Sequence, residues 1–84
     1  MRERFIATIN DAIDNNKELV VSLESGTNAI SVNIIPHAMD DGEKEIIVYS
    51  DKGILTIDTK NIQYVSELDE FVCVNNTSIV TISR

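Results

Sequence analysis

The side chains of this 84-residue chain with the greatest chemical capacity are its one histidine and its one cysteine. His37 lies near Asp40 and Asp41 in the sequence, and an imidazole with two carboxylates could hold a hard cation. Calcium-binding loops, however, place a larger set of oxygen ligands at regular intervals. We therefore expect His37 to be an ordinary surface residue and predict no metal site.

Cys73 stands in the apolar run Phe71-Val72-Cys73-Val74. A reactive thiolate requires a nearby cation or a helix N-terminus, and these neighbours offer neither. Cys73 is therefore expected to behave as a small buried hydrophobic residue. A single histidine gives little basis for a Ser-His-Asp triad, and no glycine-rich phosphate loop is found. The sequence thus predicts no catalytic residue, no cofactor and no enzymatic activity.

The clearest structural signal lies in the middle of the chain. β-Branched and other apolar residues alternate there with a period of two on either side of Asp51-Lys52-Gly53, a pattern typical of two strands joined by a turn. Gly53 is expected to adopt a positive φ. We predict a hairpin and then a short third strand, at residues 45–50, 53–58 and 61–65.

The chain opens with a helical pattern. Apolar residues recur at intervals of three or four, which predicts a helix over residues 2–15 with one apolar face. Asn15-Asn16 is a suitable end, because asparagine tolerates the left-handed conformation of a helix cap. Basic residues near the start and acidic residues near the end oppose the helix dipole, so the helix must be stabilised by packing. The apolar face consists of Phe5, Ile6, Ile9, Ala12 and Ile13.

Two further strands are predicted after the helix, at residues 18–24 and 29–35. Pro36 is expected to end the second, because proline cannot donate to a strand ladder. The polar residues 37–44 are then expected to form a loop, either a solvated connector or a contact site. In the first strand, alternation predicts that Leu19, Val21 and Leu23 face inward. In the second, Ile30, Val32 and Ile34 alternate with Ser31 and Asn33.

The chain closes with two more predicted strands, at residues 71–74 and 77–83. Asn75-Asn76 between them suits a type I′ turn. Together the elements predict one domain, residues 1–84, of the all-β class, or α+β when the helix is counted. We expect an N-terminal helix followed by a curled antiparallel sheet or small barrel of about six to seven strands.

The chain carries a net charge of −7. Nucleic-acid-binding domains usually present a basic stripe, so nucleic acid is an unexpected partner, although it is not excluded. Tyr49 and Tyr64 could stack on bases, but without basic residues between them we expect both to pack within the protein. A net charge of this size also serves solubility in a small domain.

The sequence contains no run approaching the roughly 20 apolar residues that span a bilayer. Its N-terminus alternates in charge and has no signal-peptide pattern. A lone cysteine excludes an internal disulfide and fits a reducing compartment. We expect a cytoplasmic protein that does not enter a membrane.

Two segments give the chain a resemblance to the Sm-like (LSm) small β-barrel family, over residues 2–66. The segment LVVSLESG (Leu19–Gly26) is similar to the start of that family's first motif. GILTIDTKNIQYV (Gly53–Val65) is similar to its second motif, with Thr59-Lys60 where the family has Arg-Gly. The resemblance implies a twisted five-stranded sheet that forms rings by edge pairing. It also implies RNA contacts at Lys60, Asn61 and Tyr64.

Three functional hypotheses follow. The first is a small, regulatory protein-interaction module with edge strands and acidic residues as its contact surfaces, whose edges also allow homo-oligomers. The second is an acidic inhibitor that imitates nucleic-acid charge and gathers its acids on one face, so that binding weakens as salt rises. The third is the RNA-binding ring protein that the Sm-like resemblance implies. The acids expected to meet a basic partner are Asp40, Asp41, Glu43, Glu45, Glu67, Asp69 and Glu70.

Overall fold

The computed structural model describes residues 1–74 and 78–84 of the chain. It begins with a helix, α1 (Arg2–Asp14), as the spacing of the apolar residues predicts. Asn16, just beyond the helix, has a φ of 52°, the left-handed conformation that asparagine tolerates. Phe5, Ile9 and Ala12 are buried, so the predicted apolar face is the face that packs against the strands.

Five of the strands form one antiparallel sheet, in the order β2-β1-β8-β7-β6. Its two edge strands are therefore β2 and β6. The register between β1 and β2 is unbroken over seven pairs, from Leu19 opposite Ile34 to Ser25 opposite Asn28. The strands are β1 (Leu19–Ser25), β2 (Asn28–Ile34), β6 (Ile62–Val65), β7 (Glu70–Val74) and β8 (Ile79–Ser83).

The other three strands form a second antiparallel sheet, β3 (Pro36–Asp41), β4 (Glu45–Ser50) and β5 (Gly53–Asp58), in that order. The β4–β5 hairpin has the predicted bounds, and Ser50 pairs with Gly53 across the turn. Gly53 has a φ of 131°, which confirms the positive φ expected there. The sequence therefore located this hairpin to the residue.

The expectation that Pro36 ends a strand and that residues 37–44 form a loop is wrong. Pro36 begins β3, which is an edge strand that pairs only with β4. A proline at the first residue of an edge strand removes no ladder hydrogen bond. The register shifts between Pro36 and Ala38, so His37 is the extra residue of a bulge. The irregular connection between β3 and β4 is limited to residues 42–44.

Short connections join the two sheets. Ile35 alone separates β2 from β3, and residues 59–61 separate β5 from β6. The backbone N–H of Ile35 donates to Asp51 Oδ1 (2.8 Å), and the N–H of Asp51 donates to the Ile35 carbonyl (3.2 Å). Asp51 thus holds the β4–β5 turn against the joint between the sheets. The chain has the predicted N-terminal helix and antiparallel strands, in two sheets, and the described strands form no closed barrel.

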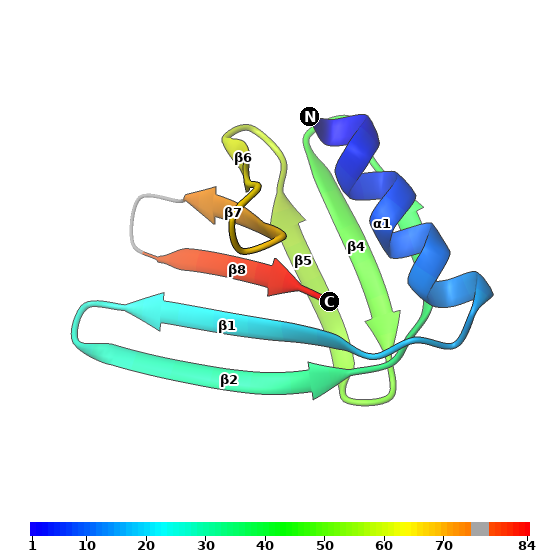
Figure 1. Ribbon diagram of the computed structural model, residues 1–84, viewed down its shortest axis with the longest axis horizontal. Coiled ribbons are helices and arrows are strands. Elements are labelled where there is room, and N and C mark those ends of the chain that lie inside the picture. The colour runs from blue at the N-terminus through cyan, green and yellow to red at the C-terminus, as the bar shows by residue number, and fades with distance from the viewer. Residues whose placement is uncertain (75–77) are drawn as a thin grey trace.

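The core lies between α1 and the two sheets (Figure 1). Phe5 of α1 meets Phe71 of β7 edge to face, with the ring centroids 5.2 Å apart. Cys73 is buried among these side chains, as expected. The other residues of this core are Ile9, Ala12, Leu19, Val21, Ile34, Ile46, Val48, Ile57, Val80 and Ile82, and Pro36 is buried as well.

The expectation that Leu23 faces inward is wrong, and its neighbours Ile30 and Val32 on β2 are exposed with it. Leu23, Ile30 and Val32 have 42%, 67% and 38% of their surface exposed. The hairpin of β1 and β2 reaches out beyond the β4–β5 turn (Figure 1), so its far half has no second sheet to cover it. The other predicted strand bounds agree to within one residue, except that β8 begins at Ile79. The predicted turn at Asn75-Asn76 and the start of that strand lie outside the described residues.

Candidate functional site

Four of the predicted partner-binding acids lie in and after β3. The Tyr49 hydroxyl donates to Asp40 Oδ2 at 2.7 Å, and this hydrogen bond raises the pKa of Tyr49 above its ordinary value. Asp41 forms an ion pair with Arg2, the first residue of α1. Glu43 and Glu45 are exposed. Two of the four carboxylates are thus already engaged by side chains of the chain itself.

A pocket of about 580 Å³ opens where the start of α1 meets the ends of the second sheet. Arg2 spans it, because Nη1 donates to Thr59 Oγ1 at 2.7 Å while Nη2 contacts Asp41 and the Gly42 carbonyl. Three basic and three acidic residues line it with one threonine, so that their formal charges cancel. They are Arg2, Lys44, Lys60, Glu43, Glu45, Asp58 and Thr59.

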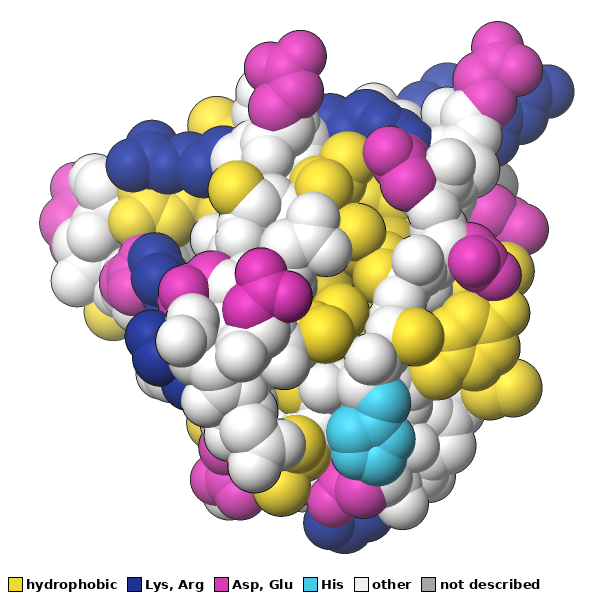
Figure 2. Space-filling model, turned by 90° about the vertical axis from the view of Figure 1, so that its right-hand side faces the viewer, with side chains coloured by type: hydrophobic (Ala, Val, Ile, Leu, Met, Phe, Trp, Pro, Cys, Tyr) yellow, Lys and Arg dark blue, Asp and Glu magenta, His cyan; other side chains and the backbone are white. Residues whose placement is uncertain are grey.

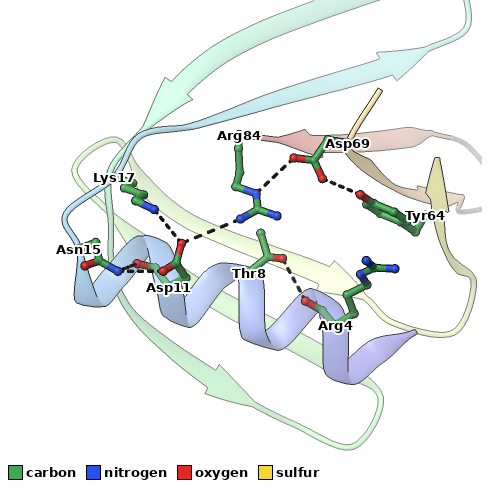
Figure 3. A network of polar contacts seen from close by, with 8 residues as sticks. All are labelled: Arg4, Thr8, Asp11, Asn15, Lys17, Tyr64, Asp69 and Arg84. Atoms are coloured by element: carbon green, nitrogen blue, oxygen red, sulfur yellow. Dashed lines mark hydrogen bonds and ion pairs between the residues drawn. The ribbon is translucent and has the colours of Figure 1, made fainter. Parts of the chain in front are cut away.

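The other predicted acids, Glu67, Asp69 and Glu70, lie at the turn between β6 and β7. The Tyr64 hydroxyl donates to Asp69 Oδ1 at 2.7 Å, and Arg84 Nε lies 3.4 Å from Asp69 Oδ2 (Figure 3). The hydrogen bond from Tyr64, helped by Arg84, lowers the pKa of Asp69. The same hydrogen bond raises the pKa of Tyr64.

Arg84 continues this network to the helix. Its Nη1 lies 4.0 Å from Asp11 Oδ2, and Lys17 Nζ donates to the same oxygen at 3.1 Å (Figure 3). The hydrogen bond from Lys17 is the main cause that lowers the pKa of Asp11. The acidic end of α1, which opposes the helix dipole, therefore faces cations from elsewhere in the chain.

The acids thus lie in two groups with separate basic partners, Arg2 for the β3–β4 connection and Arg84 for the β6–β7 turn. Figure 2 shows the face that carries α1, where acidic side chains stand at several separate places around a central apolar area. On this face, acidic side chains do not form one continuous patch.

The residues that the Sm-like resemblance assigns to RNA lie in and beside β6. Lys60 lines the pocket described above, and Asn61 is exposed. The ring of Tyr64 has the Arg4 guanidinium 4.3 Å from its centroid and the Phe71 ring at 5.0 Å. Contacts within the chain thus surround the aromatic ring that would stack on a base.

Sequence reasoning missed an open surface, the far half of the β1–β2 hairpin. Residues 28–33 of β2 are all exposed. Leu23 lies opposite Ile30, and Val21 lies opposite Val32, so these side chains share one face of the hairpin. None of the described strands lies beside the outer edge of β2. The sequence did carry a signal for this surface: the strand that follows the turn at Gly26 contains no charged residue.

A groove of about 150 Å³ lies between this face and the β4–β5 turn. One wall holds Val32 and Ile34 of β2, and the other holds Gly53, Ile54 and Leu55 of β5. Ser50 and Lys52 of the β4–β5 turn also line it, and Lys52 is paired with Asp51. Ile54 is 70% exposed. The groove thus extends the apolar surface of the hairpin toward the second sheet.

Other candidates for chemistry show ordinary surroundings. His37 is exposed in the bulge of β3, and burial raises the pKa of the Cys73 thiol to about 11. Among residues 1–74 and 78–84, no three His, Cys, Asp or Glu side chains come together as metal ligands would. Within the same residues, α1 is too short and too polar to cross a membrane.

Comparison of the chain with family models, with curated proteins and with solved structures gave no match.

Proposed function

We propose that the chain is a small, non-enzymatic protein-interaction module that takes up an extended protein segment along the open edge of β2. The observation that carries this proposal is that β2 pairs on one side only and exposes six consecutive residues. Natural sheets usually protect such an edge with lysine, proline, a bulge or a covering element. β2 contains no lysine and no proline, and its register with β1 is unbroken.

The backbone of β2 can supply the hydrogen bonds of a further strand. In an antiparallel ladder every second residue directs its N–H and C=O groups toward the neighbouring strand. With the two-residue turn between Ser25 and Asn28, the groups of Ala29, Ser31 and Asn33 point away from β1. An added strand would pair with these groups, as in β-augmentation.

The exposed apolar face supplies the specificity of such an addition. A guest strand beside β2 would place alternate side chains next to Ile30 and Val32. The groove between Val32 and Ile54 has room for apolar side chains from that strand. We therefore expect the guest to be a β-prone segment of about seven residues, the length of β2, with alternating aliphatic residues.

This mode of binding differs from acidic mimicry in its response to salt. β2 has no charged residue, so its binding should change little between about 0.05 M and 0.5 M salt. A partner held by the acids of the β3–β4 connection or the β6–β7 turn would lose affinity steeply over that range.

The test uses random peptides selected for binding to the intact chain, with affinities measured at both salt concentrations. Ile30→Lys and Ser31→Pro should each weaken the selected peptides by about tenfold or more, because one inserts a charge and the other removes an outward N–H. Leu68→Lys is the matched control, since Leu68 is 63% exposed but lies in the β6–β7 turn. Peptides that tolerate both β2 variants, or that dissociate only at high salt, would refute the proposal.

A further inference from the structure

We propose that the segment taken up by β2 is the β2 strand of a second copy of this chain, paired antiparallel about a two-fold axis at Ser31. This inference rests on the proposed function, because it names the occupant of the same edge. The result would be a closed dimer in which two five-stranded sheets join into one.

The sequence of β2, NAISVNI, is complementary to itself around Ser31. With Ser31 opposite its own copy, Ile30 lies opposite Val32 and Ala29 lies opposite Asn33. The residues that point their backbone groups outward, Ala29, Ser31 and Asn33, then meet one another as hydrogen-bonded pairs. This register uses the whole strand, since Asn28 lies opposite Ile34.

The same register continues the apolar face across the interface. Val32 of one copy would meet Ile30 of the other, and each side continues through β1 into β8 by the observed pairings. The paired residues form a row of side chains that crosses six strands, with an aliphatic side chain on every strand. The two-fold axis produces a second, identical row. The row runs through Ile82, Val21 and Val32 of one copy to Ile30, Leu23 and Val80 of the other.

The charge distribution favours a second copy at this edge. Two chains that each carry −7 repel one another over most of their surfaces. β2 brings no charge to the contact. Three acids lie beside it, and each belongs to another segment: Glu18 accepts from Asn33, Glu24 lies opposite Ala29 on β1, and Asp51 accepts from the N–H of Ile35. The two paired strands would therefore bring no like charges directly opposite each other.

The other edge strands are less suitable. β3 carries Asp40 and Asp41 and lies against α1, and β5 ends at Asp58. β6 is uncharged but has only four residues, and its Tyr64 is held beneath Arg4. β2 is thus the longest uncharged edge among the described strands.

The test is site-specific crosslinking of the full chain combined with sedimentation. Two copies of Ser31 at the axis would have Cα atoms about 5.5 Å apart, within disulfide range, so Ser31→Cys should crosslink a dimer under mild oxidation. Asn33→Cys is the matched control on the same strand: its two copies would be about 13 Å apart and should not crosslink. Cys73 is buried and should give no product in the unchanged chain.

Sedimentation should show a dimer for the unchanged chain and for Leu68→Lys, and a monomer for Ile30→Lys. A monomer at about 0.1 mM protein, crosslinking through Asn33→Cys in place of Ser31→Cys, or a ring of more than two copies would each overturn the two-fold pairing. Failure of the dimer and failure of the proposed function are distinguishable. A monomer whose selected peptides still depend on Ile30 would refute only the second copy, whereas peptides indifferent to Ile30 would refute the open edge as a binding site.

Discussion

Arg4 of α1 lies over the ring of Tyr64 of β6, with its guanidinium carbon 4.3 Å from the ring centroid. Tyr64 in turn donates to Asp69, and Asp69 pairs with Arg84 at the end of the chain. Residues far apart in sequence are thus joined at the surface of α1, above the Phe5–Phe71 contact of the core. The network attaches the helix to the edge of the five-stranded sheet that is opposite to β2.

We predict that Arg4→Ala lowers the free energy of unfolding and that Arg4→Lys lowers it by a smaller amount. A guanidinium stacks on an aromatic ring over a wide area, whereas an ammonium contributes only a point charge there. Urea unfolding of the two variants and the unchanged chain gives the comparison. Equal midpoints for all three would show that the contact contributes nothing to stability.

Stability should decrease at low pH because of Asp69. The folded state lowers the pKa of this carboxyl, mainly through the hydrogen bond from Tyr64. Its contribution is therefore present above the ordinary carboxyl pKa and is lost as the pH falls through the lowered value. Asp69→Asn should reduce stability at neutral pH and flatten its decrease between about pH 5 and pH 2. Glu67→Gln, which changes an exposed acid in the same turn, is the control and should change the urea midpoint at neutral pH much less than Asp69→Asn does.

Tyr64 should affect stability at the alkaline end of the pH profile. Its pKa is raised by the hydrogen bond that it donates to Asp69, so its contribution is present below the ordinary tyrosine pKa, near 10. That contribution is lost as the pH rises through the raised value. Tyr64→Phe should therefore remove part of the decrease in stability above about pH 10, and a profile identical to that of the unchanged chain would contradict this.

The core contact beneath the network should dominate stability. Phe5 has no exposed surface and packs edge to face on Phe71. Phe5→Ala is expected to cost about 3–5 kcal/mol, a large part of the roughly 5–15 kcal/mol that stabilises a domain. Phe5→Leu should cost less, about 1.5 kcal/mol or below, because it conserves more volume. Far-UV circular dichroism in urea measures both. A similar loss for the two variants would contradict the volume argument and show that the ring contact with Phe71 dominates.

The elements that the sequence located well are those whose signals are local. The helical spacing of apolar residues and the alternation around Gly53 predict α1 and the β4–β5 hairpin, because both are largely settled by neighbouring residues. Pro36 was misread because its effect depends on tertiary position. A proline ends an inner strand but is accepted as the first residue of an edge strand, and the sequence alone does not say which strand lies at an edge.

The open surface could not be predicted for a related reason. Alternation correctly places Leu23, Ile30 and Val32 on one face, but whether that face is covered depends on how far the second sheet reaches. The partners of the acids are equally non-local, since Asp41 meets Arg2 and Asp69 meets Arg84 only after folding. The sequence therefore identified the charged residues but not which of them neutralise one another.

Two glycines allow backbone conformation and steric space to be separated. Gly26 has a φ of 62°, and a Cβ added there would meet no heavy atom within 4 Å. Gly26→Ala should therefore cost only the strain of a left-handed backbone conformation, about 1–2 kcal/mol.

A Cβ on Gly42 would lie 2.8 Å from the Glu45 carbonyl oxygen. Gly42→Ala must therefore shift the β3–β4 connection, which Arg2 contacts through Asp41 and the Gly42 carbonyl. Gly42→Ala should cost more than Gly26→Ala and should increase hydrogen exchange in the first turn of α1, which Gly26→Ala leaves unchanged. A larger loss of stability for Gly26→Ala would contradict this and mean that the β1–β2 turn tolerates an added Cβ less well than the β3–β4 connection does.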